Sequence, residues 1–146
     1  MNIIGIDPGK SGAIVSMTDD GNFIAECRLS DTPADVWNWL DAVHRNGRHA
    51  FVEKVSSSPQ MGVTSAFTFG RGVGFLEGIL TAAGIPFEYV APQKWQKAMG
   101  CLTGGDKNKS KAAAQRLWPG AKIAHWNADA RLIAEYGRRV LNERNR

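Results

Sequence analysis

The chain has 146 residues and a mass of 15.9 kDa, with 43% hydrophobic residues, 22% charged residues and a formal net charge of +4. This length predicts one domain over residues 1–146, and this composition excludes wholesale disorder because it supports a buried core. No apolar run approaches the roughly 20 residues that cross a bilayer, so we expect no membrane segment.

The first part of the chain predicts three short strands in succession. We expect strands over residues 2–7, 13–17 and 23–29, because each is an apolar run bounded by turn-forming residues. The segments 7–12 and 18–22 are rich in Asp and Gly, which favour tight turns. Short turns between consecutive strands predict an antiparallel meander.

The rest of the chain alternates between strands and helices. Pro33 favours a helix start, and we expect further helices over about 61–83, 92–99, 109–117 and 127–142. Short strands are expected over 50–53 and 86–90. This order predicts an α/β fold with a mixed five-stranded sheet and flanking helices. Four tryptophans are expected to be packing residues: Trp37, Trp39, Trp95 and Trp118.

Three carboxylates occupy positions where side chains often carry chemistry. Asp7 ends the first strand and Glu53 ends the fourth, and sites in open α/β sheets form at strand ends. Asp129 lies early in the last helix, at the edge of its apolar face. Three acids gathered together would repel one another unless cations neutralise them, and hard oxygen ligands favour Mg²⁺ or Mn²⁺. Such ions can hydrolyse a phosphodiester.

Each acid also has a simple structural interpretation. Asp7 before Pro-Gly is typical of a turn cap, Glu53 could be an exposed charge at a strand end, and Asp129 could be an acid favoured by the helix dipole. The set of three is more specific than any single member.

Three motifs in this order resemble the RuvC Holliday-junction resolvases, and small phage-type members most of all. The motifs are Ile4-Gly5-Ile6-Asp7-Pro8-Gly9, Phe51-Val52-Glu53-Lys54-Val55 and Ala128-Asp129-Ala130. The resemblance runs nearly end to end and extends through the segments 69–73, 87–95 and 107–111.

The resemblance implies a ribonuclease-H-like fold and a homodimer. It also implies Mg²⁺-dependent cutting of four-way DNA junctions by paired nicks that leave 5′ phosphate and 3′ hydroxyl ends. Asp7, Glu53 and Asp129 would then be metal ligands, with two ions per active site and Mn²⁺ as a substitute.

The chain departs from the family pattern at two places. The family has a fourth ligand, Asp or His, one turn before the last aspartate, where this chain has Trp126. His125 could bind a metal or assist proton transfer, or be an exposed histidine at the helix start, whereas Asn127 could supply a carbonyl oxygen or cap the helix. The second departure lies in the loop after Glu53. This loop lacks the aromatic residue that some relatives place there.

Several residues outside the acidic motifs are candidates for contact with DNA. Residues 1–73 carry a net charge of −2 and residues 74–146 carry +6, which suggests a polyanion-binding surface on the second half. The densest basic stretch would contact phosphates, or would simply be a solvated helix face. In the loop after Glu53, Gln60 and Met61 could enter the junction. The Gly-Arg-Gly segment resembles a helix start, where Arg71 could meet phosphate. The basic stretch contains Lys107, Lys109, Lys111 and Arg116.

Two other functions compete with a nuclease. The chain could bind branched DNA without cutting it, because the fourth ligand is missing. The Asp-Pro-Gly turn also resembles the phosphate loop of actin-like ATPases, although 146 residues are too few for the two lobes of that class. A reducing, cytoplasmic location is expected, because Cys27 and Cys101 form neither a disulfide framework nor a zinc motif and the N-terminus lacks signal-peptide features.

Overall fold

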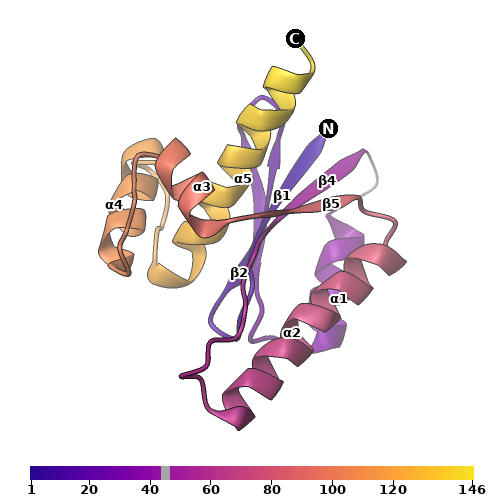
Figure 1. Ribbon diagram of the computed structural model, residues 1–146. Coiled ribbons are helices and arrows are strands. Elements are labelled where there is room, and N and C mark those ends of the chain that lie inside the picture. Colours follow the sequence, from indigo (N-terminus) through magenta and orange to yellow (C-terminus); the bar gives the residue numbers. More distant parts are fainter. Residues whose placement is uncertain (44–46) are drawn as a thin grey trace.

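A mixed five-stranded sheet forms the centre of the structure, a computed structural model that describes residues 1–43 and 47–146 (Figure 1). The strand order is β3-β2-β1-β4-β5, in which β1, β2 and β3 are antiparallel and β4 and β5 run parallel to β1. This arrangement confirms the predicted fold class. The strands are β1 (Asn2–Asp7), β2 (Ala13–Thr18), β3 (Phe23–Arg28), β4 (Arg48–Glu53) and β5 (Phe87–Val90).

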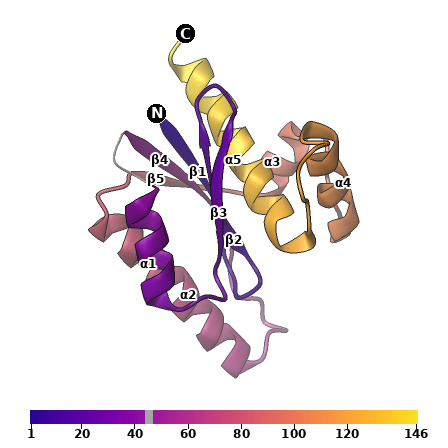
Figure 2. The same cartoon turned by 180° about the vertical axis from the view of Figure 1, so that it is seen from behind.

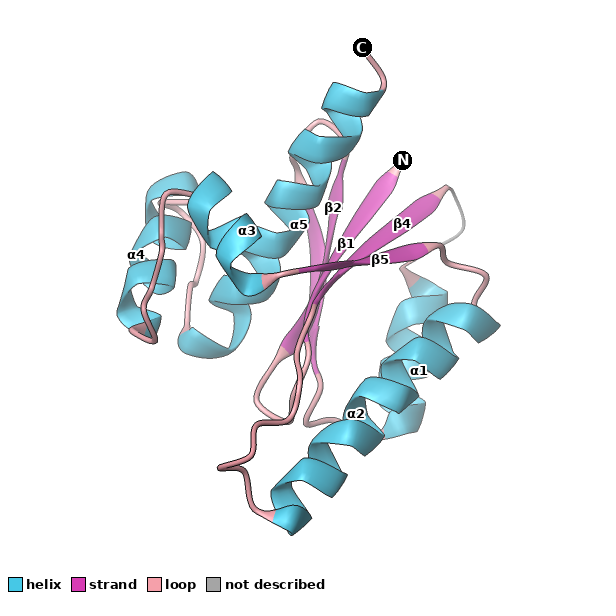
Figure 3. Ribbon diagram, in the orientation of Figure 1, coloured by secondary structure: helices cyan, strands magenta, loops and turns pink. Residues whose placement is uncertain are grey.

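Helices cover both faces of the sheet (Figures 2 and 3). On one face α1 (Pro33–Ala42) and α2 (Val63–Ala82) pack against Ile4, Ile6 and Ile14. On the other face α5 (His125–Arg144) crosses the sheet, with α3 (Pro92–Ala98) and α4 (Lys107–Leu117) beside it. Within the described part of the chain, no helix is long and apolar enough to cross a membrane.

Strand register brings the ends of β1 and β4 together on the face that α5 covers. The two strands are parallel neighbours, with Ile6 opposite Val52, so Asp7 and Glu53 leave the sheet at the same edge. Because side chains alternate between faces, Asp7 lies on the same face as Ile3, and Glu53 on the same face as Phe51. Both Ile3 and Phe51 belong to the core beneath α5.

Two glycines allow α5 to lie directly on the sheet. A Cβ atom on Gly5 would stand 2.2 Å from the carbonyl oxygen of Ala130 and 2.3 Å from the amide nitrogen of Ala134. A Cβ atom on Gly137 would stand 2.2 Å from the ring of Phe51. Real Cβ atoms do not approach other atoms this closely, so both positions require glycine. The close contact fixes the start of α5 over the end of β1.

Several elements begin at other residues than expected. The α4 helix starts at Lys107 rather than 109, because the Asp106 side chain caps it by accepting a hydrogen bond from the Asn108 amide at 2.9 Å. The α5 helix starts at His125 rather than near 127. Of the four tryptophans, Trp95 is fully buried, whereas Trp37 is 40% exposed and is not the core residue that was expected.

A buried acid on α5 should make stability depend on pH. Glu135 is buried, and Arg138 and Arg139 each donate to it at 2.7 Å. Burial raises the pKa of Glu135, but these hydrogen bonds outweigh burial and hold the pKa below its ordinary value of 4.5. The ion pairs of Glu135 with Arg138 and Arg139 therefore stabilise the fold fully above about pH 4.5, and this stabilisation is lost as the pH falls through the lowered pKa of Glu135.

We expect Glu135→Gln to cost about 1–3 kcal/mol of unfolding free energy near neutral pH, because two charged partners lose their acceptor. Urea unfolding of both proteins at several pH values checks this expectation. The difference between them should shrink as the pH falls below 4.5 and through the lowered pKa of Glu135, and a difference that stays constant would show that the charge of Glu135 is not involved.

Candidate active site

Asp7 stands at the end of β1, where a tight turn leads into β2. Gly9 has a φ of 114°, which favours glycine, and the Gly12 amide donates to the Gly9 carbonyl at 3.1 Å. A Cβ atom on Gly12 would lie 1.9 Å from the carbonyl oxygen of Asp7. The turn therefore holds the Asp7 backbone in close contact with the start of β2.

Glu53 stands at the end of β4 and is held by a tryptophan from α3. The indole nitrogen of Trp95 donates to Oε2 of Glu53 at 2.7 Å, and the Trp95 side chain is fully buried. Sequence reasoning assigned Trp95 to packing only. Its N–H orients one carboxylate oxygen of Glu53 and leaves the other oxygen available for a ligand.

Asp129 lies in the second turn of α5, four residues after His125. Ser110 on α4, whose hydroxyl donates to the Lys107 carbonyl at 3.2 Å, lies close enough to Asp129 to lower its pKa, as do the charges of Lys107 and His125. Ser110 itself is buried, and sequence reasoning did not single it out. His125 is exposed at the first position of α5, as one of the two sequence interpretations expected.

The carboxylates lie close enough for the charges of Asp129 and Glu53 to raise the pKa of Asp7, and for the charge of Asp129 to raise that of Glu53. Burial, followed by the charges of Asp129 and Glu53, raises the pKa of Asp7 to about 8, and Lys107 opposes the rise. Burial also raises the pKa of Glu53, together with the charge of Asp129 and against the Trp95 hydrogen bond. The pKa of Asp129 is raised by burial, against Ser110, Lys107 and His125. Such a cluster gains free energy when positive charge enters it.

A cavity of about 320 Å³ opens onto two of these acids. Asp7 and Asp129 line it together with Lys107 and His125, so it brings residues from β1, α4 and α5 together. As the side chains stand, no three His, Cys, Asp or Glu residues among 1–43 and 47–146 are arranged to hold a metal ion. The remaining lining residues are Pro8, Gly9, Ser11, Gly12 and Trp126.

Asn127 is committed to structure rather than to the cavity. Its side-chain carbonyl accepts from the Ala124 amide at 2.8 Å, and its amide group donates to Glu26 and to the Lys122 carbonyl. Asn127 is buried. The capping interpretation is therefore confirmed, because its carbonyl oxygen already accepts a hydrogen bond at the helix start.

Three basic residues of the second half line a cavity separate from the acidic one. Lys97 from α3 and Lys109 and Arg116 from α4 line a cavity of about 490 Å³. Lys107 lies in the acidic cavity instead, and Lys111 is half-buried on α4. Lys107 of the predicted basic stretch therefore lines a different cavity from Lys109 and Arg116.

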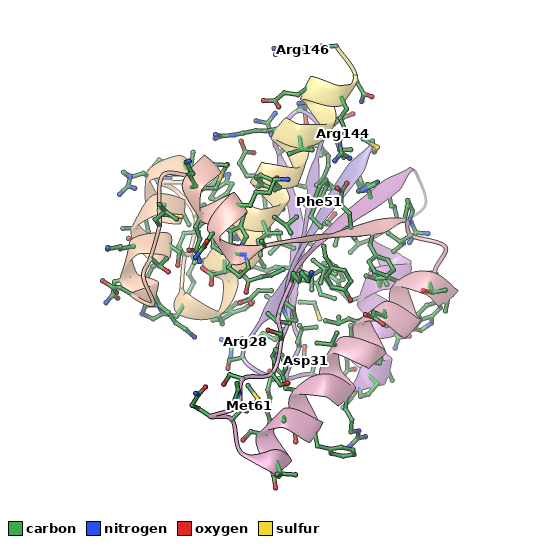
Figure 4. All side chains as sticks on the ribbon, viewed as in Figure 1. Arg28, Asp31, Phe51, Met61, Arg144 and Arg146 are labelled. Atoms are coloured by element: carbon green, nitrogen blue, oxygen red, sulfur yellow. The ribbon has the colours of Figure 1, made fainter. Side chains whose placement is uncertain are left out.

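The remaining candidates for DNA contact lie on α2 and the loop before it. Gln60 is exposed and Met61 half-buried in this loop, which begins directly after Glu53 (Figure 4). Arg71 is exposed in the interior of α2, so the expected helix start at the Gly-Arg-Gly segment is wrong. Its Cζ atom lies 5.9 Å from the centre of the Phe67 ring. The helix begins at Val63 and continues through the glycines.

Comparison with known proteins is informative at the level of structure. No protein-family model matches the sequence, and no curated protein matches it. The structure described as Thermus thermophilus RuvC is similar with a TM-score of 0.69 and 17% identity, covering 98% of this chain and 97% of that one. T. thermophilus RuvC in complex with a Holliday junction substrate is similar with a TM-score of 0.64 and 17% identity, covering 92% and 90%. The chain therefore has a RuvC-like fold of the ribonuclease-H type.

Proposed function

We propose that this chain is a divalent-metal-dependent endonuclease that resolves four-way DNA junctions by paired nicks, leaving 5′ phosphate and 3′ hydroxyl ends. The observation that supports this proposal is that strand register and a shared cavity bring the half-buried Asp7, Glu53 and Asp129 from three separate elements to one edge of the sheet, where their charges act on Asp7. One structural neighbour was solved with a Holliday junction, which supports branched DNA as the substrate.

The donor set of the cluster fits Mg²⁺, with Mn²⁺ as a substitute. Three carboxylates supply hard oxygen ligands, and burial with mutual repulsion raises the pKa of Asp7 to about 8, so a cation would be favoured there. Asp7, Glu53 and Asp129 would hold the ions, and the resemblance implies two per site. A bound pair supplies activation of the attacking water and stabilisation of the departing oxygen.

Other side chains at the site have distinct roles in the proposal. Lys107 would contact the phosphate, since its charge already acts on all three carboxylates. His125 is exposed beside the cavity and would move a proton at the reacting phosphate. Trp95 is a positioning residue, because its indole N–H donates to Glu53, and Ser110 lies beside Asp129 and holds the Lys107 carbonyl.

We expect Trp95→Phe to reduce cleavage by about 10–100-fold, which is the usual effect of losing a partner that orients a metal ligand. The substitution keeps an aromatic ring but removes the N–H that orients Glu53. Single-turnover cleavage at saturating protein measures the effect. Junction affinity in the absence of metal should stay within about threefold, and an unchanged cleavage rate would show that the hydrogen bond does not position Glu53.

We also propose that two copies of the chain pair through the outer face of α2. Val63 is 88% exposed and Phe67 is 67% exposed on this helix. Gly70, Gly74 and Gly78 continue the same face, and a Cβ atom added at any of them would meet nothing within 4 Å. A two-fold dimer would match a nearly symmetric junction and place one site on each of two opposing strands.

The expected result of Phe67→Glu is a monomer at concentrations where the parent chain is a dimer, because a charge would enter the apolar seam. Sedimentation velocity measures the change, and Thr64→Glu serves as a control for added charge one residue beyond Val63. A parent chain that is monomeric throughout, or a Phe67→Glu variant that still dimerises, would exclude this seam.

A second candidate function is binding of branched DNA without cleavage. Trp126 stands where the family has a fourth ligand, and it cannot bind a metal. A cleavage assay on a synthetic four-way junction with Mg²⁺ or Mn²⁺, using linear and flap DNA as controls, separates the two functions. Paired symmetric nicks support the endonuclease, binding without nicks supports the second candidate, and ATP turnover without DNA would favour the actin-like alternative.

A further inference from the structure

A second cavity adjoins the acidic one on the far side of the β1–β2 turn. It has a volume of about 290 Å³ and shares Ser11, Gly12 and Trp126 with the acidic cavity. Its other lining residues are Lys10, Arg28 and Ser30. Every charged side chain in this lining is therefore a cation, whereas the adjoining cavity contains two carboxylates.

Strand register places Arg28 in one row with Asp7. Asp7 pairs with Ala13, and Ala13 pairs with Arg28 on the next strand, so the three side chains point to the face that α5 covers. Two strand spacings of about 4.8 Å put the Arg28 backbone about 10 Å from that of Asp7. Ala13, the residue between them, is fully buried in the core beneath α5.

Trp126 forms the wall between the two cavities and orients Arg28. The Cζ atom of Arg28 lies 4.4 Å from the centre of the Trp126 ring. A stacked guanidinium keeps its N–H donors in the plane at its edge, available to an acceptor. Because Arg28 covers this face of the ring, the cavity offers hydrogen-bond donors there rather than a platform on which a base could stack.

The donor set of this cavity matches a phosphate. Lys10 and Arg28 are exposed, and neither forms an ion pair with any of the residues that the structure describes. Ser11 and Ser30 add hydroxyl groups, and phosphate oxygens accept from both groups of donors. The Leu29 amide donates to the Gly12 carbonyl at 3.1 Å, which holds the end of β3 beside the turn.

We propose that the cavity lined by Lys10, Ser11, Arg28, Ser30 and Trp126 binds a second phosphate of the DNA strand that lies over the carboxylates. This inference rests on the proposed function, since it assumes that the scissile phosphate occupies the adjoining cavity. Trp126, which replaces a family ligand, thereby gains a positioning role: it separates the two phosphates and holds Arg28 toward the second.

The test is the salt dependence of junction binding in EDTA, where no strand is cut. Each phosphate contact contributes about 0.9 to the slope of log Kd against log salt concentration. We expect the double variant Lys10→Gln, Arg28→Gln to lower this slope by about one unit, which corresponds to one phosphate. Lys10→Gln alone, at an exposed side chain, should lower the slope by part of that amount.

Two further variants serve as controls. Arg48→Gln with Arg146→Gln removes the same charge and should keep the parent slope. Arg48 lies beside Asn2, at the end of β1 opposite Asp7, and Arg146 lies far from Arg28 (Figure 4). Arg28→Lys keeps the charge but loses the planar stacking group and should keep most of the slope. If Arg28 only packed on Trp126, Arg28→Lys would weaken binding as much as Arg28→Gln does. That result, or equal slopes for the two double variants, would overturn the phosphate site.

The outcome for the proposed function is separate. A parent chain that binds no branched DNA would contradict the proposed function. Titration with inorganic phosphate would then test separately whether the cavity binds a phosphate. Shifts of the Trp126 indole signal in NMR spectra that disappear in the Lys10→Gln, Arg28→Gln variant would support the site. Spectra that do not change with phosphate would overturn it.

Discussion

The Asp7→Asn variant is expected to lose at least about 100-fold in junction cleavage, because loss of a partner that only orients a metal ligand already costs about 10–100-fold. Asp7 is the carboxylate on which the other two act most clearly, since the charges of both Asp129 and Glu53 raise its pKa. An amide in its place removes one anionic ligand while keeping the shape of the side chain. Junction binding in EDTA should persist, because a carboxyl with a pKa of about 8 is mostly protonated near pH 7 without metal, so the amide changes the charge of the site little.

The matched control is Asp41→Asn, which makes the same chemical change at an exposed position on α1. It should leave both cleavage and binding unchanged. Full cleavage by the Asp7→Asn variant would show that Asp7 is not a metal ligand. Equal losses in both variants would instead point to a general effect of net charge.

Gly5→Ala is expected to destabilise the fold by about 3 kcal/mol or more, a large share of the 5–15 kcal/mol typical of a domain. The added methyl group would stand within 2.3 Å of backbone atoms of Ala130 and Ala134, which cannot move aside as a flexible side chain could. To relieve the clash, α5 would have to move off β1. That movement would also carry Asp129 away from Asp7.

Gly72→Ala is the control for this prediction, because a Cβ atom at Gly72 meets nothing within 4 Å on α2. Replacing a helical glycine with alanine stabilises by about 0.5–1 kcal/mol. Urea unfolding measures both variants against the parent chain. A Gly5→Ala chain within about 0.5 kcal/mol of the parent would show that α5 does not lie as close to β1 as the structure has it.

Local sequence patterns were sufficient to predict the strands and the ends at which Asp7 and Glu53 lie. Apolar runs that end in an acid depend only on neighbouring residues, so they can be identified without knowledge of the fold. The strand order could not be predicted in this way. That β4 lies directly beside β1, which brings the two acids together, depends on pairing between residues more than 40 positions apart.

Contacts between distant elements account for what the sequence did not indicate. The hydrogen bond from Trp95 to Glu53 spans 42 residues, and the one from Asn127 to Glu26 spans 101. No local pattern distinguishes a tryptophan that packs from one that also donates to a carboxylate. The residue pattern predicted one helix over about 61–83, which α2 confirms, whereas the family resemblance suggested a helix start at Arg71, which is wrong. Leu76, Ile79 and Leu80 bury the later turns, and α2 continues through the glycines.

The measurement that tests the central claim most directly is anomalous scattering from crystals of this chain soaked in Mn²⁺. The account predicts a manganese peak at the edge of β1 and β4, with carboxylate oxygens of Asp7 and Asp129 at about 2.1 Å, as expected for an ion of this size. The same peak should be absent from the Asp7→Asn variant. Manganese elsewhere in the crystal but not between these acids would contradict the claim that they form a cation site.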